Sequence, residues 1–219
     1  EDHADTLNLK LDNPLQSDQS HLRNSLIPGL LDVLELNLAR QNLTTQFFER
    51  GRVFRVIDGQ LAELISVGFI SLGKSLNRKW LERSEFDFYS AKACTEDLFR
   101  LLPFKVKKPR WSPIEASKFW QPKHSAEAGN LSKDGYEVSI GLLNIKNIKE
   151  HWGLSNPIFA GSLLIQKELF EKDMKHFRYE GLSNQPASMK DLSLVVVKEV
   201  LADEVLETIK GFIAQSIDG

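Results

Sequence analysis

The sequence predicts an α+β domain, in which antiparallel strands form a sheet flanked by helices. The main observation is a strong hairpin signal. Residues 47–57 alternate as a strand, Asp58-Gly59 is a two-residue turn, and residues 61–72 return as the partner strand. A second observation is that strands of this type recur along the chain, with only a few helical segments between them.

Two segments before residue 103 have the spacing of helices, residues 25–43 and residues 87–102. In the first, Ser25 can cap the start, and Pro28 falls in the first turn, where proline is tolerated. Each segment places a stripe of side chains on one face. The stripes are Leu26, Ile27, Leu30, Leu31, Leu34 and Leu38 in the first, and Phe88, Ala91, Thr95, Leu98 and Leu102 in the second.

The middle of the chain predicts loop and then more strands. Residues 103–125 contain four prolines and several lysines and arginines, which indicates mostly loop with one short strand. Residues 135–145 and 157–169 have strand composition, and we expect a short helix or turn near His151 to join them.

Turn-forming residues over 181–188 interrupt the pattern and indicate a domain boundary. After this break, residues 191–200 predict a strand and residues 203–217 a last helix with one apolar face. We therefore expect residues 1–182 to form one domain and residues 183–219 to begin another.

Composition limits the classes of function. The 219-residue chain has a net charge of −2 and a pI near 6.3, so its bulk charge gives no reason to expect nucleic-acid binding. Cys94 is the only cysteine, which excludes an intrachain disulfide and indicates a reducing, cytoplasmic compartment. We expect it to be a small packed residue and not a nucleophile. None of the five histidines has a paired metal spacing, and no apolar run approaches the roughly 20 residues of a membrane span.

Two local patterns have features of phosphate binding. Gly68, Gly73, Lys74 and Ser75 match the spacing of a phosphate-binding loop, but the FISL between the glycines should pair its amides in a sheet. We therefore interpret this match as chance.

The other pattern is the basic run KVKKPRW, residues 105–111. Its cations Lys105, Lys107, Lys108 and Arg110 could contact an RNA backbone. We favour a solvated loop, because no second basic cluster extends the run.

Five stretches together carry a resemblance to one family. They are NPLQSDQSHLRNSLIPGLLDVLELNLAR (13–40), FFERGRVFR (47–55), EFDFYSAKACTEDLF (85–99), WQPKHSA (120–126) and PASMKDLSLVV (186–196). In this order they resemble the β subunit of bacterial phenylalanyl-tRNA synthetases. For example, the second is similar to that family's Phe-Glu-x-Gly-Arg-Val-Phe.

The resemblance implies a class II aminoacyl-tRNA synthetase-like antiparallel sheet over residues 1–182. Residues 183–219 would be the first strand and helix of a ferredoxin-like anticodon-binding domain, whose remaining strands would lie beyond Gly219. The implied protein is the β subunit of phenylalanine–tRNA ligase, which charges tRNA(Phe) and uses ATP and magnesium in the holoenzyme. The implied partners are tRNA(Phe) and the α subunit, in an assembly of two α and two β chains.

The same resemblance implies that this module is not catalytic and serves assembly with the α subunit. Catalytic class II members carry Phe-Arg-x-Glu, whose Arg neutralises the α-phosphate of ATP and whose acid lies on the same sheet face. Here Arg55 is kept, but Ile57 holds the acid position and offers no acceptor. Asp58-Gly59 also leaves room only for a tight turn. We therefore expect no catalytic, cofactor-binding or metal residue, and Arg55 to be a relic of an ATP-binding position.

Two alternatives stay open. A free-standing synthetase-like ATP-binding enzyme would need an acid on the face of Arg55, and Glu49, six residues back, is the candidate. An RNA-binding module would use Lys105–Arg110. Within WQPKHSA the chain also departs from the family pattern, with Gln121 in place of a histidine and Lys123 in place of a glycine.

Overall fold

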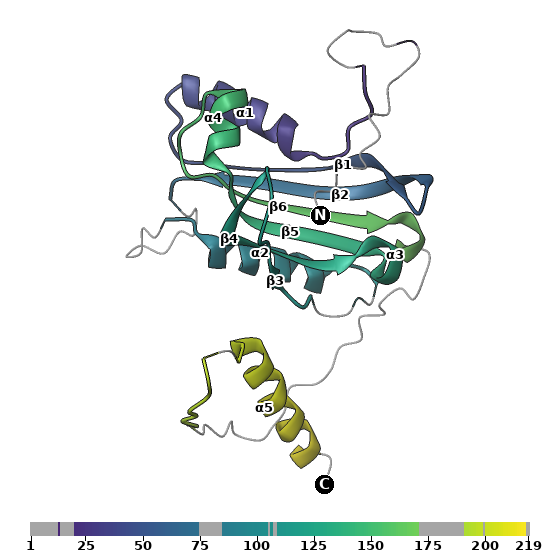
Figure 1. The fold of residues 1–219 in the computed structure, drawn as a ribbon, viewed down its shortest axis with the longest axis vertical. Helices are drawn as coiled ribbons and strands as arrows, with labels where there is room; N and C mark the ends of the chain where they lie inside the picture. Colours follow the sequence, from purple (N-terminus) through teal and green to yellow (C-terminus); the bar gives the residue numbers. More distant parts are fainter. Residues whose placement is uncertain are drawn as a thin grey trace. The chain divides into compact units, whose positions relative to one another are not determined.

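The computed structural model describes residue 13 and residues 20–74, 85–104, 106, 109–170, 191–198 and 200–217. The chain divides into two compact units, Glu1–His176 and Phe177–Gly219, and each is described by itself. Figure 1 labels the helices and strands of both units.

The first unit contains strands and helices in an irregular alternation. In chain order they are α1 (Ile27–Ala39), β1 (Thr45–Ile57), β2 (Gln60–Leu72), α2 (Phe88–Leu101), β3 (Ser112–Pro113), β4 (Trp120–Asn130), α3 (Leu131–Asp134), β5 (Tyr136–Leu143), α4 (Ile145–Trp152), β6 (Phe159–Gln166) and a 3-10 helix, η2 (Lys167–Phe170).

The strands form one six-stranded sheet in the order β1-β2-β6-β5-β4-β3, and all neighbouring strands are antiparallel. This confirms the predicted α+β class. β1 and β2 form the predicted hairpin, with Ile57 opposite Gln60. Asp58 and Gly59 make its turn with φ of 51° and 79°, the left-handed conformations of a type I′ turn.

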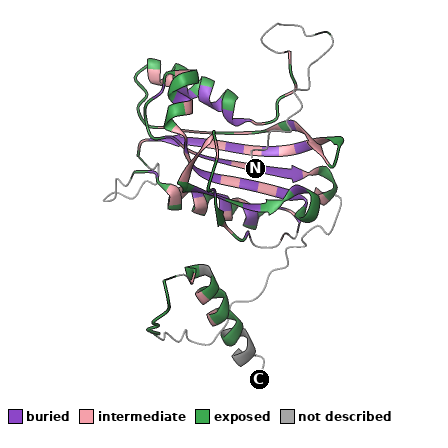
Figure 2. Ribbon diagram, viewed as in Figure 1, coloured by how far each residue is buried: buried purple, intermediate pink, exposed green. Residues whose placement is uncertain are grey.

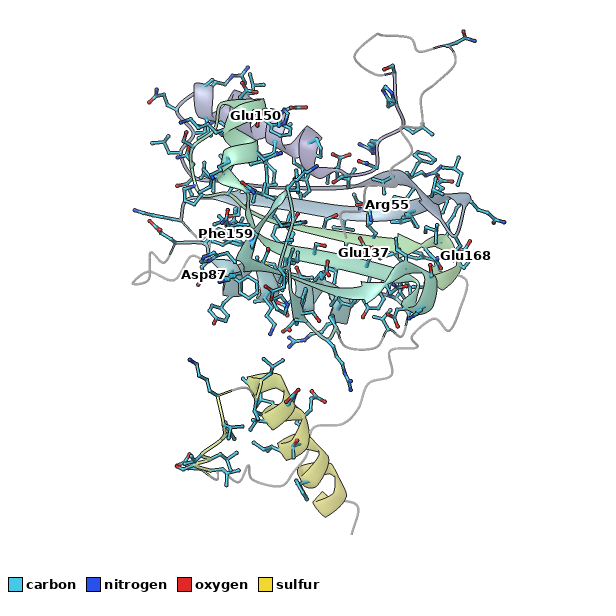
Figure 3. The ribbon with its side chains drawn as sticks, in the orientation of Figure 1. Arg55, Asp87, Glu137, Glu150, Phe159 and Glu168 are labelled. Atoms are coloured by element: carbon cyan, nitrogen blue, oxygen red, sulfur yellow. The ribbon has the colours of Figure 1, made fainter. Side chains whose placement is uncertain are left out.

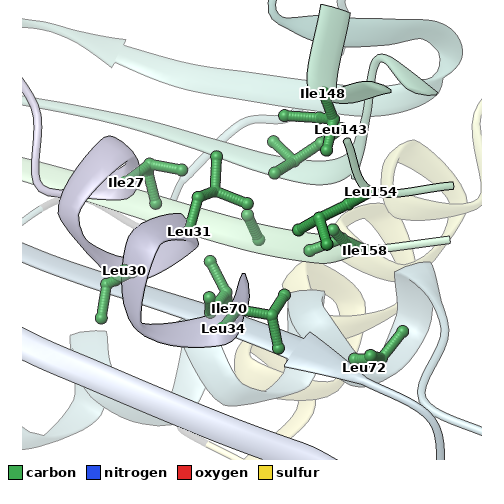
Figure 4. Packing of buried hydrophobic residues seen from close by; sticks show 11 residues of the cluster. Ile27, Leu30, Leu31, Leu34, Ile70, Leu72, Leu143, Ile148, Leu154 and Ile158 are labelled. Atoms are coloured by element: carbon green, nitrogen blue, oxygen red, sulfur yellow. The ribbon is translucent and has the colours of Figure 1, made fainter. Parts of the chain in front are cut away.

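The pairing register assigns the side chains of the sheet to two faces, because successive residues of a strand point to opposite sides. On one of them, the α1 face, helices α1 and α4 pack against the sheet. Leu31 and Leu34 of α1 meet Ile70 of β2, Leu143 of β5 and Ile148 of α4 in one buried cluster (Figure 4). The leucine spacing that predicted the helix is therefore the buried stripe of α1.

On the opposite side, the α2 face, helix α2 packs over β5 and β6. Phe99 of α2 contacts Tyr136 of β5, with ring centroids 5.1 Å apart and Val138 in the same cluster. The helix begins at Phe88, one residue after the predicted start. Asp87 caps it, because its carboxylate accepts a hydrogen bond from the Ser90 amide at 2.7 Å. Figure 2 shows that β5 and β6 consist of buried and intermediate residues, with several consecutive buried residues in β6.

One strand departs from the prediction. The sequence predicts mostly loop with one short strand over residues 103–125, and the two-residue strand β3 lies in this range. In addition, β4 begins at Trp120, continues beyond residue 125 and pairs with β5. The register shifts between Trp120 and Ser125, so the residues between them bulge out of the ladder. Pro122 conceals the strand from sequence reasoning, because proline cannot donate to a ladder and is accommodated at such a bulge.

The second unit confirms one predicted element and contradicts another. Its helix α5, Ala202–Ile217, agrees with the helix predicted over 203–217. The strand predicted over 191–200 is wrong, because the described residues 191–198 form no strand and Val195 is fully exposed. A strand needs a neighbour that pairs with its amides and carbonyls, and the described part of this unit provides none.

Gly141 of β5 is required at its position opposite the bulge. Its φ is 135°, which residues with side chains rarely adopt, and a Cβ there would overlap the backbone of His124 and Ser125. We expect Gly141→Ala to lower the free energy of unfolding by about 3 kcal/mol, because the β4 backbone must move. Urea unfolding followed by tryptophan fluorescence measures this loss.

Gly153 is the matched control, because it has a φ of 68° as the C-cap of α4 and a Cβ there meets nothing within 4 Å. Gly153→Ala should cost about 1 kcal/mol from the left-handed backbone alone. If Gly141→Ala costs no more than Gly153→Ala, the close approach of β4 and β5 is not a constraint on stability.

Candidate functional site

Arg55 lies on the α1 face near the end of β1, among apolar side chains. Val53, on the same face, is fully buried, and Ile57 packs against the same cluster. The buried members of this cluster are Leu26, Val53, Leu64, Leu131 and Leu164. Ile57, two residues after Arg55, therefore adds apolar contact at this end of the strand.

The guanidinium of Arg55 is paired with Glu137 of β5 across two intervening strands (Figure 3). Arg55 Nη1 donates to Glu137 Oε1 at 2.8 Å, and the two side chains are 23% and 19% exposed. In the sheet, Glu137 lies opposite Leu164, which lies opposite Ser66. Ser66 lies opposite Gly51, four residues before Arg55, so the ion pair runs diagonally over the sheet.

Glu137 balances the positive charge of Arg55, whose side chain has little access to water. A half-buried guanidinium without an acid has lost hydration that nothing replaces. Arg55 Nε and the Ser66 hydroxyl are both buried without a hydrogen-bond partner among the described residues, so Glu137 is the main compensation for Arg55. A phosphate group that bound Arg55 would compete with this carboxylate.

Glu49 is not the acid beside Arg55. Its Oε1 accepts a hydrogen bond from Arg23 Nη1 at 2.8 Å, and Arg23 Nε donates to the Arg52 carbonyl at 2.9 Å. Glu49 lies on the face of Arg55, as the spacing along the strand predicts, but its carboxylate pairs with Arg23 and not with Arg55. Glu137 escaped sequence reasoning because its proximity depends on the order of the strands. The signal that could have indicated it is a single acid inside the otherwise uncharged strand YEVSIGLL.

The segment with phosphate-loop spacing is part of the sheet. Gly68 lies opposite Ser162 of β6, and Ile70 lies opposite Ala160. Because β2 has a paired strand on each side, its amides are engaged in ladders and do not cradle a phosphate. This confirms that the FISL segment, residues 69–72, is part of a strand, while Ser75 lies outside the described residues.

The basic run is only partly described. Lys105, Lys107 and Lys108 lie outside the described residues, and Arg110 is exposed. Trp111, the next residue, is half-buried, and its indole N–H donates to Glu96 Oε1 at 3.3 Å. Contact between this run and RNA stays a prediction.

Metal-ligating and nucleophilic side chains are sparse in the part of the chain that the structure describes. There, no group of three or more His, Cys, Asp or Glu is placed to hold a metal ion. Cys94 of α2 is exposed, so the prediction of a packed cysteine is wrong. Partial burial of the thiol, and then the charge of Asp97, raise the pKa of Cys94, which keeps the thiol protonated at neutral pH.

The helices that the structure describes include none with the length and apolar character needed to cross a membrane.

The chain is similar to proteins of one family. Residues 1–163 match the family described as phenylalanyl tRNA synthetase beta chain CLM domain. Among similar proteins, the chloroplastic phenylalanine–tRNA ligase beta subunit of Phaeodactylum tricornutum is 33% identical over 203 residues, which cover 90% of this chain and 28% of that protein.

Two bacterial relatives give the same result. The phenylalanine–tRNA ligase beta subunit of Methylococcus capsulatus is 32% identical over 203 residues, covering 90% of this chain and 24% of the relative. That of Carboxydothermus hydrogenoformans is 30% identical over 213 residues, covering 96% and 26%. The chain spans about a quarter of the length of these curated relatives. Since the family match extends over most of its 219 residues, the chain belongs to the family of the phenylalanyl-tRNA synthetase beta chain CLM domain.

Proposed function

We propose that this chain is a section of the β subunit of phenylalanine–tRNA ligase, and that its first unit is a class II synthetase-like module without catalytic activity. The family match and the names of the relatives support the identity. The observation that carries the lack of catalysis is the ion pair between Arg55 and Glu137.

The residues around this pair support the same proposal. A catalytic strand needs a free Arg for the α-phosphate of ATP and an acid on the same face. Here a carboxylate from β5 neutralises Arg55, and Ile57 packs into an apolar cluster. The turn of two residues, Asp58 and Gly59, gives no long loop to cover a nucleotide. In this proposal the first unit holds no catalytic, cofactor-binding or metal residue.

The wider assembly follows from this identity. ATP and magnesium act in the holoenzyme, whose active site lies in the α subunit. Two α and two β chains assemble, tRNA(Phe) is the RNA substrate, and the enzyme works in the cytoplasm. Residues 1–182 form the synthetase-like module. Residues 183–219 begin a ferredoxin-like anticodon-binding domain, to which α5 belongs.

A partly uncovered surface with apolar side chains supports the assembly role. We call it the β1–β2 surface, and its apolar members are the α2-face side chains Phe48, Phe54, Val56, Ile65, Val67 and Phe69. Arg50, Arg52 and Glu63 lie among them on the same face, with Arg52 and Glu63 in an ion pair. Phe48 is 80% exposed and lies opposite the half-buried Phe69. Helix α2 packs over β5 and β6 and leaves this part of the sheet to another partner, for which the α subunit is our candidate.

The lack of catalysis can be tested by phenylalanine-dependent exchange of pyrophosphate into ATP. We expect none from the chain alone. We also expect none from Glu137→Gln, because freeing Arg55 restores neither the acid at Ile57 nor the long loop. The same substitution should lower the free energy of unfolding by about 2 kcal/mol, since it leaves a half-buried guanidinium without its carboxylate.

The control is Asp97→Asn, which disturbs the exposed Asp97–Arg100 ion pair of α2, whose atoms are 2.9 Å apart. Its stability should change by less than about 0.5 kcal/mol. Phenylalanine-dependent exchange by the unmodified chain would refute the non-catalytic proposal. Equal stability changes for the two variants would show that Glu137 does not compensate Arg55.

The assembly role can be tested by co-purification with the tagged α subunit. We expect the unmodified chain to be retained and Phe48→Asp to weaken the interaction by about tenfold or more, because a charge would have to be buried in the interface. Leu101→Asp is the matched control, since Leu101 is 77% exposed on α2 and lies outside the β1–β2 surface. Retention of Phe48→Asp at the level of the control would exclude this surface as the interface.

A further inference from the structure

A hollow on the first unit lies between the beginning of α2, strand β3 and the bulge of β4. Figure 3 labels Asp87, the N-cap of α2, at this end of the helix. We propose that the hollow binds single-stranded RNA, with a base against its aromatic side chains and a neighbouring phosphate on Lys123. This inference rests on the geometry of the first unit and does not depend on the assembly role.

Aromatic side chains supply the stacking surface. Tyr89 is 75% exposed, and Phe88 contacts it edge to face, with ring centroids 5.6 Å apart and planes at 79°. Trp111 lines the same hollow, and its hydrogen bond to Glu96 holds the indole in place. A ring that is held in this way loses little freedom when a base stacks on it, and stacking accepts any base because each has a π face.

The bulge of β4 supplies the positive charge. Lys123 has a φ of 65°, a conformation that is unfavourable for a residue with a side chain. The distortion turns both Lys123 and His124 outward, and both are exposed at the hollow. Neither side chain forms an ion pair with a described residue, so each is available to a ligand. Unfavourable backbone conformations persist only where the surrounding structure holds them, and they are frequent at ligand-binding sites.

The combination of rings with the unpaired Lys123 decides the class of ligand. Rings without cations would suit an apolar peptide, and cations without rings would suit any anion. Together they match a nucleotide segment, whose bases stack and whose phosphates are negatively charged. Arg110 is exposed and directly precedes Trp111, so it extends the positive charge beyond the hollow along a bound strand.

A fluorescence-anisotropy titration of the whole chain with a labelled oligouridine of about 12 nucleotides tests the proposal. We expect saturable binding with a Kd on the order of micromolar at low salt, weakening as salt increases. Tyr89→Ala should weaken binding roughly tenfold, because it removes a stacking face. Tyr89→Phe keeps that face and should bind like the unmodified chain.

A second variant separates binding from folding. Lys123→Gly relieves the left-handed conformation, so we expect its melting temperature to be equal or higher while its RNA affinity falls several-fold. The slope of log affinity against log salt should also decrease in magnitude by about 0.7, the value for one phosphate contact on a single strand. Lys133→Gln removes an exposed cation on α3, away from the hollow, and should change neither property.

Three results would overturn the proposal. They are an absence of saturable RNA binding, binding that Tyr89→Ala and Lys123→Gly leave unchanged, and an equal loss of affinity for Lys133→Gln. The competing ligand is an acidic peptide with aromatic residues, so the titration is repeated with a labelled peptide of alternating Asp and Phe. Tighter binding of that peptide than of the RNA would likewise overturn the proposal.

Discussion

The pairing register of β2 is the constraint on which most of the first unit depends. This strand pairs with β1 along its whole length and with β6 over residues 64–71, so the direction of each of its side chains is fixed from both sides. A slip by one residue would move Leu64 and Ile70 from the α1 face to the α2 face and remove both from their buried clusters. The same register brings Arg55 within reach of Glu137. The cores and the candidate site are therefore consequences of one pairing.

The Arg55–Glu137 pair depends on that register and adds little to stability beyond it. Taking two charges out of water costs about as much as their attraction returns, whereas removing one partner leaves the other uncompensated. We therefore interpret Glu137 as the residue that compensates the charge of the retained Arg55. In the proposed function, this compensation and the packing of Ile57 convert a phosphate-binding face into a packing surface. The absence of a long loop after Asp58 agrees with that conversion, because a surface that packs has no nucleotide to cover.

The elements that are specified by residues close together in the sequence were predicted correctly. The leucine spacing gave α1 its buried stripe, and Asp58-Gly59 specified the hairpin turn, so both were found from the sequence. β4 was missed because Pro122 and its charged neighbours have loop composition, and only pairing with β5 makes them part of a strand. At the candidate site, Arg55 could be predicted from its motif. Glu137 could not, since no local feature specifies that β5 lies two strands away from β2.

The bulge of β4 shows how a broken local rule can create a site. Lys123 adopts a left-handed conformation that suits glycine. On the facing strand, Gly141 has the wide φ that lets its backbone approach Ser125, so both strands share the distortion. An ordinary ladder at this point would alternate side chains between the two faces of the sheet. The bulge instead presents Lys123 and His124 together, beside the ring of Trp111. The irregularity that hides the strand from sequence reasoning is thus also what assembles the hollow.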